Sequence, residues 1–176
     1  MFSHIVDSNS TFTAVHSSGL SDKVGKICEF YQFDNEKTKK MLIAANLHDI
    51  GKLAIPNSIL DKNGKLTDDE FALIKSHTYY TRAAQEKIDG FEDITNWAAN
   101  HHEKLDGNGY PYGLNANEIS FESRLMGCLD MYQALTETRP YREGLGHEKT
   151  MSILYEHAQK GFIDTQIVKD IDSYFQ

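Results

Sequence analysis

The chain has 176 residues, which suits one domain that is large enough to bury a hydrophobic core without disulfide bonds. Its formal net charge of −8 argues against a protein that binds nucleic-acid polymers nonspecifically, because such proteins carry a basic surface. Hydrophobic residues make up 40 % of the chain, and no apolar run approaches the roughly 18 residues of a membrane span, which argues against membrane insertion. No signal peptide is evident, and Cys28 and Cys128 lack metal-ligand spacing, so we expect a cytoplasmic protein with two buried free thiols.

A first amphipathic helix is predicted from about Thr13, where apolar residues recur at near-helical spacing as far as Tyr31. Gly19 and Gly25 weaken this pattern. His16 lies near the start of the segment. A single histidine there is usually an ordinary surface or core residue, so its role depends on which other side chains accompany it.

His48 and Asp49 follow an uninterrupted run of good helix formers, residues 41–47. Gly51 stands where a left-handed helix cap would fall, so we expect the pair on the last turn of a mostly buried helix. Neighbouring side chains on a helix point about 100° apart, which makes it difficult for one metal ion to bind both. An Asp49 carboxylate that bridges two metal ions would resolve this geometry. A structural hydrogen bond between the two side chains is the alternative.

The next helix start has a clear signal. Thr67 and Glu70 have the spacing of a capping box, in which each residue caps the backbone of the other. His77 lies three and four residues after the apolar Ile74 and Leu73. Since residues at that spacing share a helix face, His77 is expected to point into the core.

A further helix is predicted from about Asp93 to Glu103, with His101 and His102 near its end. Adjacent histidines at a helix end are either a solvated pair or a pair of ligands. The loop that follows, residues 105–111, contains two Asx-Gly steps and a proline, so we expect it to be rigid. Such a loop either forms the wall of a pocket or is an ordinary surface turn.

Ser120 can cap a helix that runs to about Thr136 and carries Asp130. Arg139 and Arg142 follow on either side of a stiff proline. A guanidinium group can bind phosphate oxygens through two parallel hydrogen bonds, although a solvated surface position is the alternative for both residues.

Two more helices complete the chain, one from about Glu148 to Lys160, closed by Gly161, and one that ends near Phe175. The sequence contains no convincing alternating strand pattern and no internal repeat. It therefore predicts an all-α fold.

Together the predicted helices supply a set of imidazole and carboxylate side chains without a thiolate. Such donors suit iron, manganese, zinc or nickel better than calcium or magnesium. Two such ions, bridged by Asp49, would hold a water molecule as hydroxide and clamp a phosphoryl group for in-line attack, so hydrolysis of a phosphoester is the reaction that the set supports. The candidate side chains are His16, His48, Asp49, His77, His101, His102 and Asp130.

The chain resembles the HD-GYP family, a branch of the HD phosphohydrolase superfamily, nearly from end to end. The residues that carry the resemblance are His48–Lys52, the stretch from Ile55 to His77, His101–Pro111, Asp130 and residues 139–142. The resemblance implies a single-domain helical bundle, residues 1–176, that encloses a dinuclear metal site. Iron or manganese is the expected metal, with zinc or nickel as alternatives.

The resemblance also implies a role for each site residue. The seven candidate side chains would be metal ligands, and Asp49 and Lys52 would be catalytic. Lys52 would contact the scissile phosphate or protonate the leaving oxygen. Lys52, Arg139, Arg142 and Tyr110 would bind the substrate.

The sequence departs from the family pattern at two positions. Phe12 stands where members with three metals carry a glutamate four residues before the first histidine, so we expect two metal ions and not three. Gln133 stands where the family usually has a second aspartate, three residues after Asp130.

The function that the resemblance implies is hydrolysis of a cyclic dinucleotide by a metal-bridging hydroxide, most directly cyclic di-GMP to pGpG or GMP. Two alternatives stay open. One is that cyclic GMP-AMP is the substrate. The other is a degenerate module that binds nucleotide or a signalling partner without turnover, and Gln133 is the reason to consider it. The chain is expected to be a domain of a longer signalling protein, with a sensory or receiver domain before it, and to form a homodimer.

Overall fold

The computed structural model describes residues 11–138 and 143–176, with side chains described from His16 onward. Within these ranges the chain is helical and contains no β-strand, only an isolated bridge between Asp106 and Asn115, so the all-α prediction is confirmed. No helix of the described ranges is long and apolar enough to cross a membrane. The elements are α2 (Thr11–Phe30), α3 (Asn35–Leu47), the 3₁₀ helix η1 (Ile50–Ala54), α4 (Asn57–Leu60), α5 (Asp68–Lys75), α6 (His77–Gln85), α7 (Glu92–Ala99), α8 (Phe121–Thr136), α9 (His147–Gln159) and α10 (Thr165–Phe175).

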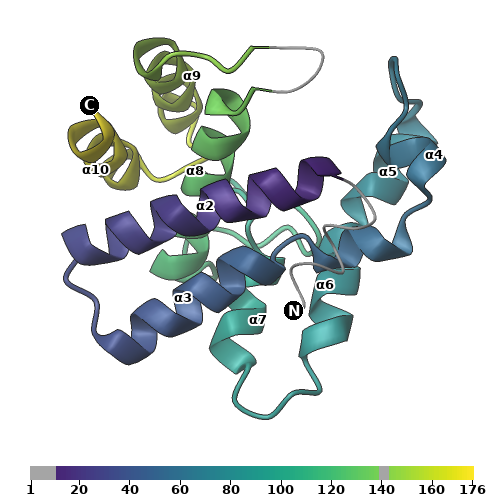
Figure 1. Ribbon diagram of the computed structural model, residues 1–176, viewed down its shortest axis with the longest axis horizontal. Coiled ribbons are helices and arrows are strands. Elements are labelled where there is room, and N and C mark those ends of the chain that lie inside the picture. Colours follow the sequence, from purple (N-terminus) through teal and green to yellow (C-terminus); the bar gives the residue numbers. More distant parts are fainter. Residues whose placement is uncertain (1–10, 139–142) are drawn as a thin grey trace.

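The hydrophobic core lies around α2, which crosses the middle of the molecule between α3 and the group formed by α8, α9 and α10 (Figure 1). Leu20, Leu125 and Leu154 are fully buried in this core. Truncation of such a leucine to alanine typically costs about 2–5 kcal/mol. Cys28 and Cys128 are buried in the same core as free thiols, as the sequence predicted.

Side-chain caps fix where several of the helices begin, and the sequence predicted two of these caps. Thr67 accepts a hydrogen bond from the Glu70 amide, and the Glu70 carboxylate accepts one from the Thr67 amide, so the predicted capping box is confirmed. Ser120 accepts a hydrogen bond from the Ser123 amide and caps α8 in the same way. The cap of α8 sets the register of the helix that carries Asp130.

The helix before the His48–Asp49 pair ends earlier than predicted. His48 is the C-cap of α3 and Asp49 precedes η1, so the two residues do not share a last helical turn. The prediction of a left-handed cap at Gly51 is also wrong, because Gly51 lies inside η1 without a positive φ. A Cβ at this position would lie 1.9 Å from the carbonyl oxygen of His77 and 2.6 Å from the amide nitrogen of Thr81. The close approach of α6, and not a cap, therefore requires glycine here.

The helix α7 ends at Ala99 and not at Glu103, so His101 and His102 lie in the turn that follows it. The packing of α8 against this turn leaves no room for a larger residue at Gly127, where a Cβ would lie 2.6 Å from the carbonyl oxygen of His101. Tertiary contact with α8 thus determines the positions of the two histidines. Helical periodicity alone would put them on a continued α7.

Glu103 anchors the loop after this turn. Its buried carboxylate accepts hydrogen bonds from the amides of Tyr112, at 2.7 Å, and Leu114, at 3.0 Å. Gly107 has a positive φ of 78°, as its Asx-Gly step allows, and the peptide bond between Tyr110 and Pro111 is cis. These contacts hold Tyr110 over the site described next.

Candidate metal centre

Three of the predicted ligands share one local geometry. In each, the ring Nδ1 lies within hydrogen-bond distance of the backbone carbonyl three residues earlier, at 2.8 Å for His48, 2.7 Å for His77 and 2.6 Å for His101. Because a carbonyl oxygen only accepts, Nδ1 must carry the hydrogen, and the lone pair is left on Nε2. The local backbone therefore presents three imidazoles in the tautomer that binds a metal through Nε2.

A first donor group consists of His77, His101 and His102, whose potential ligand atoms lie within 4.8 Å of one another. His77 begins α6, whereas the other two come from the turn after α7. Burial lowers the pKa of all three imidazoles, to about 4 for His102, because it disfavours the charged ring. These histidines are therefore held neutral, which is the form that binds metals.

A second donor group consists of His16, His48 and Asp49, again with ligand atoms within 4.8 Å of one another. Asp130 on α8 adjoins it, since its Oδ1 lies 2.8 Å from His16 Nε2 and 3.6 Å from His48 Nε2. All four residues are buried. The second group thus joins α2, the end of α3 and α8.

Asp49 belongs to the second group and also faces the first. Its Oδ2 is 3.3 Å from His48 Nε2, and its Oδ1 is 3.3 Å from His77 Nε2. Burial alone would raise the pKa of Asp49, but the neighbouring Lys52 and His48 outweigh it and hold this pKa well below the usual range. An ionised carboxylate with one oxygen toward each group is suited to bridge two cations.

The residues present fit a divalent metal. Among the described residues, His48 Nε2, His77 Nε2 and Asp49 Oδ1 are buried without a hydrogen-bond partner. A buried polar atom left unpaired costs about 1–3 kcal/mol. Cations between the two groups would satisfy all three atoms, and a mixed imidazole and carboxylate set suits divalent metals.

His16 and Lys52 supply the cationic side chains next to the carboxylates. Burial alone would lower the pKa of His16, but hydrogen bonds with Asp130 and Glu137 outweigh it and raise the pKa to about 9. Lys52 on η1 is half-buried, and its Nζ lies 2.5 Å from Asp49 Oδ2. An ammonium group therefore lies directly beside the centre.

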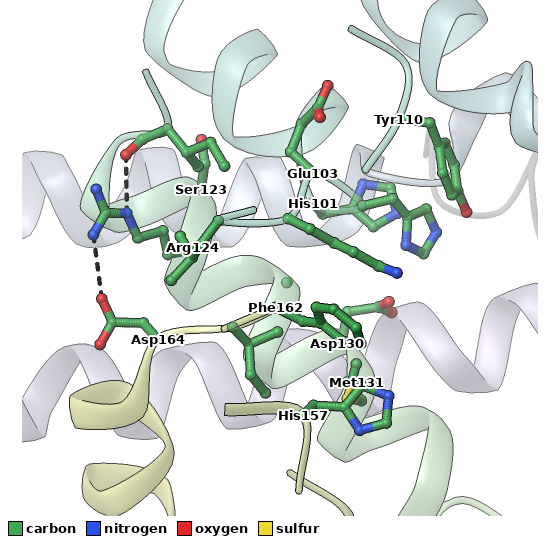
Figure 2. A pocket seen from close by; sticks show the side chains of 16 residues that line it. His101, Glu103, Tyr110, Ser123, Arg124, Asp130, Met131, His157, Phe162 and Asp164 are labelled. Carbon is green, nitrogen blue, oxygen red and sulfur yellow. Dashed lines mark hydrogen bonds and ion pairs between the residues drawn. The ribbon is translucent and has the colours of Figure 1, made fainter. Parts of the chain in front are cut away.

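A cavity of about 270 Å³ is lined by His101 and His102 of the first donor group and by Asp130. Figure 2 shows His101 and Tyr110 on one side of it, with Phe162, Met131 and His157 on the other. The Tyr110 ring packs against the ring of His102, with 4.8 Å between the two ring centroids. Of the two alternatives for the loop at 105–111, a pocket wall or a surface turn, the structure shows the pocket wall, and α8, α9 and the turn before α10 supply the facing wall.

Some predicted positions fall elsewhere. Arg139 and Arg142 lie outside the described residues. Phe12 lies within α2, one turn before His16, and its side chain is outside the described part. Gln133 does not face the donor groups: its Oε1 accepts a hydrogen bond of 2.6 Å from Lys23, and its side chain packs on Gly19 of α2.

Three supporting residues were missed by the sequence analysis. Glu137 contacts His16 Nδ1 at 2.9 Å, and Glu103 anchors the loop that carries Tyr110. The Thr81 hydroxyl accepts a hydrogen bond from the Gly51 amide and donates one to the backbone carbonyl of His48. The position of Glu103 directly after the two histidines was a signal that could have identified it. Glu137 and Thr81 had no such signal, because their partners are distant in sequence.

Known proteins resemble this chain over most of its length. Residues 1–167 match the model of the HD domain family. The 3'3'-cGAMP-specific phosphodiesterase 1 of Vibrio cholerae is 34 % identical over 180 residues, which cover 100 % of this chain and 42 % of that protein. A cyclic di-GMP phosphodiesterase response regulator of Xanthomonas campestris pv. campestris is 36 % identical over 154 residues, 85 % of this chain and 39 % of that protein.

The chain therefore spans about two fifths of the length of these curated relatives. Among solved structures, an HDG"Y"P protein from Bdellovibrio bacteriovorus has the same fold, with a TM-score of 0.74 at 19 % identity over 93 % of this chain and 52 % of that one. The family match covers nearly all of the sequence and includes every described residue of both donor groups. The chain belongs to the HD domain family.

Proposed function

We propose that the chain is a metal-dependent phosphodiesterase that hydrolyses a cyclic dinucleotide, with cyclic di-GMP as substrate and pGpG or GMP as product. The observation that carries this proposal is the pair of buried donor groups that Asp49 connects. The names of the two relatives, a 3'3'-cGAMP and a cyclic di-GMP phosphodiesterase, support the substrate class. Cyclic GMP-AMP is the alternative substrate.

We infer that the centre holds two divalent ions, iron or manganese, with zinc or nickel as alternatives. Divalent ions at such a site supply Lewis acidity and lower the pKa of a water molecule. Asp49 would be shared between the two ions. One ion would be held by His16, His48 and Asp130, and the other by His77, His101 and His102.

Lys52 is the side chain best placed to act on the substrate. Its ammonium already lies against the shared carboxylate of Asp49. A cation held there stabilises the negative charge that develops on phosphate oxygens in the transition state, and its proton can pass to the leaving oxygen. We therefore assign catalytic roles to Lys52 and Asp49.

We propose that the cavity beside the centre receives one nucleobase of the substrate. The rings of Tyr110 and Phe162 are flat apolar surfaces at its edge, and stacking of a base on an aromatic ring is worth about 1–3 kcal/mol. Arg139 and Arg142 would hold the phosphates through paired hydrogen bonds. Changing either arginine to alanine should raise KM and leave the metal content unchanged.

The test is a product analysis with the purified chain loaded with Mn²⁺ or, without oxygen, Fe²⁺. Cyclic di-GMP, cyclic GMP-AMP and linear pGpG are incubated separately and the products are separated by chromatography. We expect cleavage of at least one cyclic dinucleotide by a protein that contains two metal ions. Tight binding of nucleotide without any product, at full metal content, would favour the degenerate binding module.

We also propose that residues 1–176 form the catalytic domain of a longer signalling protein, which contains a sensory or receiver domain and acts as a homodimer in the cytoplasm. The shares of 42 % and 39 % of the two relatives that the chain covers support a longer parent protein.

A further inference from the structure

The His16 ring is held differently from the rings of His48, His77 and His101. Whereas His48, His77 and His101 donate from Nδ1 to a carbonyl of their own segment, the Nδ1 of His16 contacts Oε2 of Glu137 at 2.9 Å. Both side chains are almost fully buried, at 8 % and 6 % exposure. A buried carboxyl group therefore lies opposite the His16 ring.

The geometry of α8 explains how this carboxylate reaches His16. Glu137 is the C-cap of α8 and follows Asp130 by seven residues, which is about two helical turns, so both face α2. The His16 ring lies between them, with Nε2 at 2.8 Å from Asp130 and Nδ1 at 2.9 Å from Glu137. Gln133, one turn before Glu137, is directed to Lys23 instead.

We propose that Glu137 is the positioning residue of His16. Its carboxylate accepts the hydrogen bond from Nδ1–H, which fixes the ring orientation and leaves the Nε2 lone pair for the metal ion next to Asp130. A carboxylate partner on the far nitrogen also makes the imidazole a stronger donor. The proposal rests on the metal binding in the proposed function, and it assigns Glu137 to the ion of the second donor group only.

The test compares the metal affinities of the two sites. Metal-free wild type, Glu137→Ala and Glu137→Gln are titrated with Mn²⁺ in a calorimeter. We expect Glu137→Ala to weaken one binding step by about 10–100-fold and to leave the other unchanged. Glu137→Gln keeps an oxygen that accepts the same hydrogen bond, so it should lose less. Glu29→Ala removes an exposed carboxylate from α2 and should match the wild type.

A second measurement reads the tautomer of His16 directly. In the Zn²⁺-loaded protein, ¹H–¹⁵N spectra of the histidine rings should show a protonated Nδ1 at His16 in wild type and Glu137→Gln, and this signal should be lost or exchange-broadened in Glu137→Ala. Equal weakening of both Mn²⁺ steps, or no weakening of either, would overturn the assignment of Glu137. An anomalous-scattering peak bonded to the Glu137 carboxylate would also overturn it. A wild-type chain that binds no divalent ion would contradict the proposed function itself.

Discussion

Asp49 is the residue on which both donor groups depend, because each of its oxygens faces one of them. Removing this carboxylate leaves each ion with three protein donors and no shared anion between them. We expect Asp49→Ala to lose both metal ions and all measurable hydrolysis, as checked by elemental analysis of the purified variant and by product chromatography. A variant that kept its metal and its rate would exclude a bridging role.

Lys52 is expected to behave differently, because it contacts the carboxylate and is not itself a ligand. Loss of a cation that acts in the transition state typically lowers kcat by about 10²–10³-fold. Lys52→Ala should therefore retain two metal ions per chain and turn over much more slowly. Lys62→Ala, which removes an exposed ion pair with Glu70, is a control that should leave both quantities unchanged. Loss of metal in Lys52→Ala would mean that this lysine is needed for metal binding and would contradict a purely catalytic role.

The charge of His16 makes metal binding dependent on pH. Its pKa of about 9 in the metal-free fold lies above the ordinary value of 6.5, so the imidazolium stabilises that fold fully below about pH 6.5, and this contribution is lost as the pH rises through about 9. An ion at Nε2 must displace this proton. Calorimetry of Mn²⁺ binding near neutral pH, in two buffers with different ionisation enthalpies, should show release of about one proton more for wild type than for His16→Gln. Identical heats in both buffers would contradict this.

Residue types and spacing were sufficient to single out the side chains that the fold brings together, because metal chemistry restricts which side chains can serve as ligands. His16 and Asp130 were weak signals separately, and the fold brings them to 2.8 Å from each other. Glu137 could not have been found this way, since its contact with His16 spans most of the chain and no local pattern marks it. Gln133 was expected to matter at the centre because of its spacing, whereas its side chain is hydrogen-bonded to Lys23.

At the scale of elements, the site depends on how closely α6 approaches η1. Gly51 has no room for a Cβ, because the neighbouring atoms belong to the α6 backbone and cannot move aside. We expect Gly51→Ala to destabilise the fold by about 1–3 kcal/mol and to reduce metal content, since His48 and His77 lie on the two segments that would be forced apart. Urea unfolding and elemental analysis check both effects.

The matched control is Gly25→Ala, at a helix-interior position where the Cβ would meet Leu42 at an ordinary 3.7 Å. There the substitution should stabilise the protein by about 0.5–1 kcal/mol, because alanine loses less backbone entropy in a helix. If both glycine variants changed stability in the same direction, the close approach at Gly51 would not be what constrains it.

Helix starts were more predictable than helix ends. Thr67 and Ser120 cap through contacts with residues three positions away, and such local chemistry is visible in the sequence. The ends of α3 and α7 depend instead on packing against α6 and α8. The two helices therefore end at Leu47 and Ala99, before the positions that the hydrophobic periodicity predicted. Both ends carry candidate ligands, and the irregular turns there orient these side chains toward a common centre.

At the scale of the whole molecule, the donor groups join segments that are distant in sequence: α2, the end of α3, the start of α6, the turn after α7, and α8. Figure 1 shows these segments meeting near the middle of the bundle. Because the groups exist only when all of these segments are in place, metal ions bind the folded chain and not the unfolded one. Metal binding must therefore stabilise the fold as a whole.

Removal of the metal should consequently lower the melting temperature. An ion present at 100 times its dissociation constant stabilises the fold by about 2.7 kcal/mol, and 1 kcal/mol corresponds to about 2–4 °C in a chain of this size. We expect chelation to lower the Tm by about 5–10 °C for each ion, with recovery when Mn²⁺ is restored, as followed by circular dichroism. Asp49→Ala should melt at the same temperature with and without the chelator, since it has no bridged ions to lose. A wild-type Tm that chelation leaves unchanged would mean that the two donor groups do not hold metal across the segments they connect.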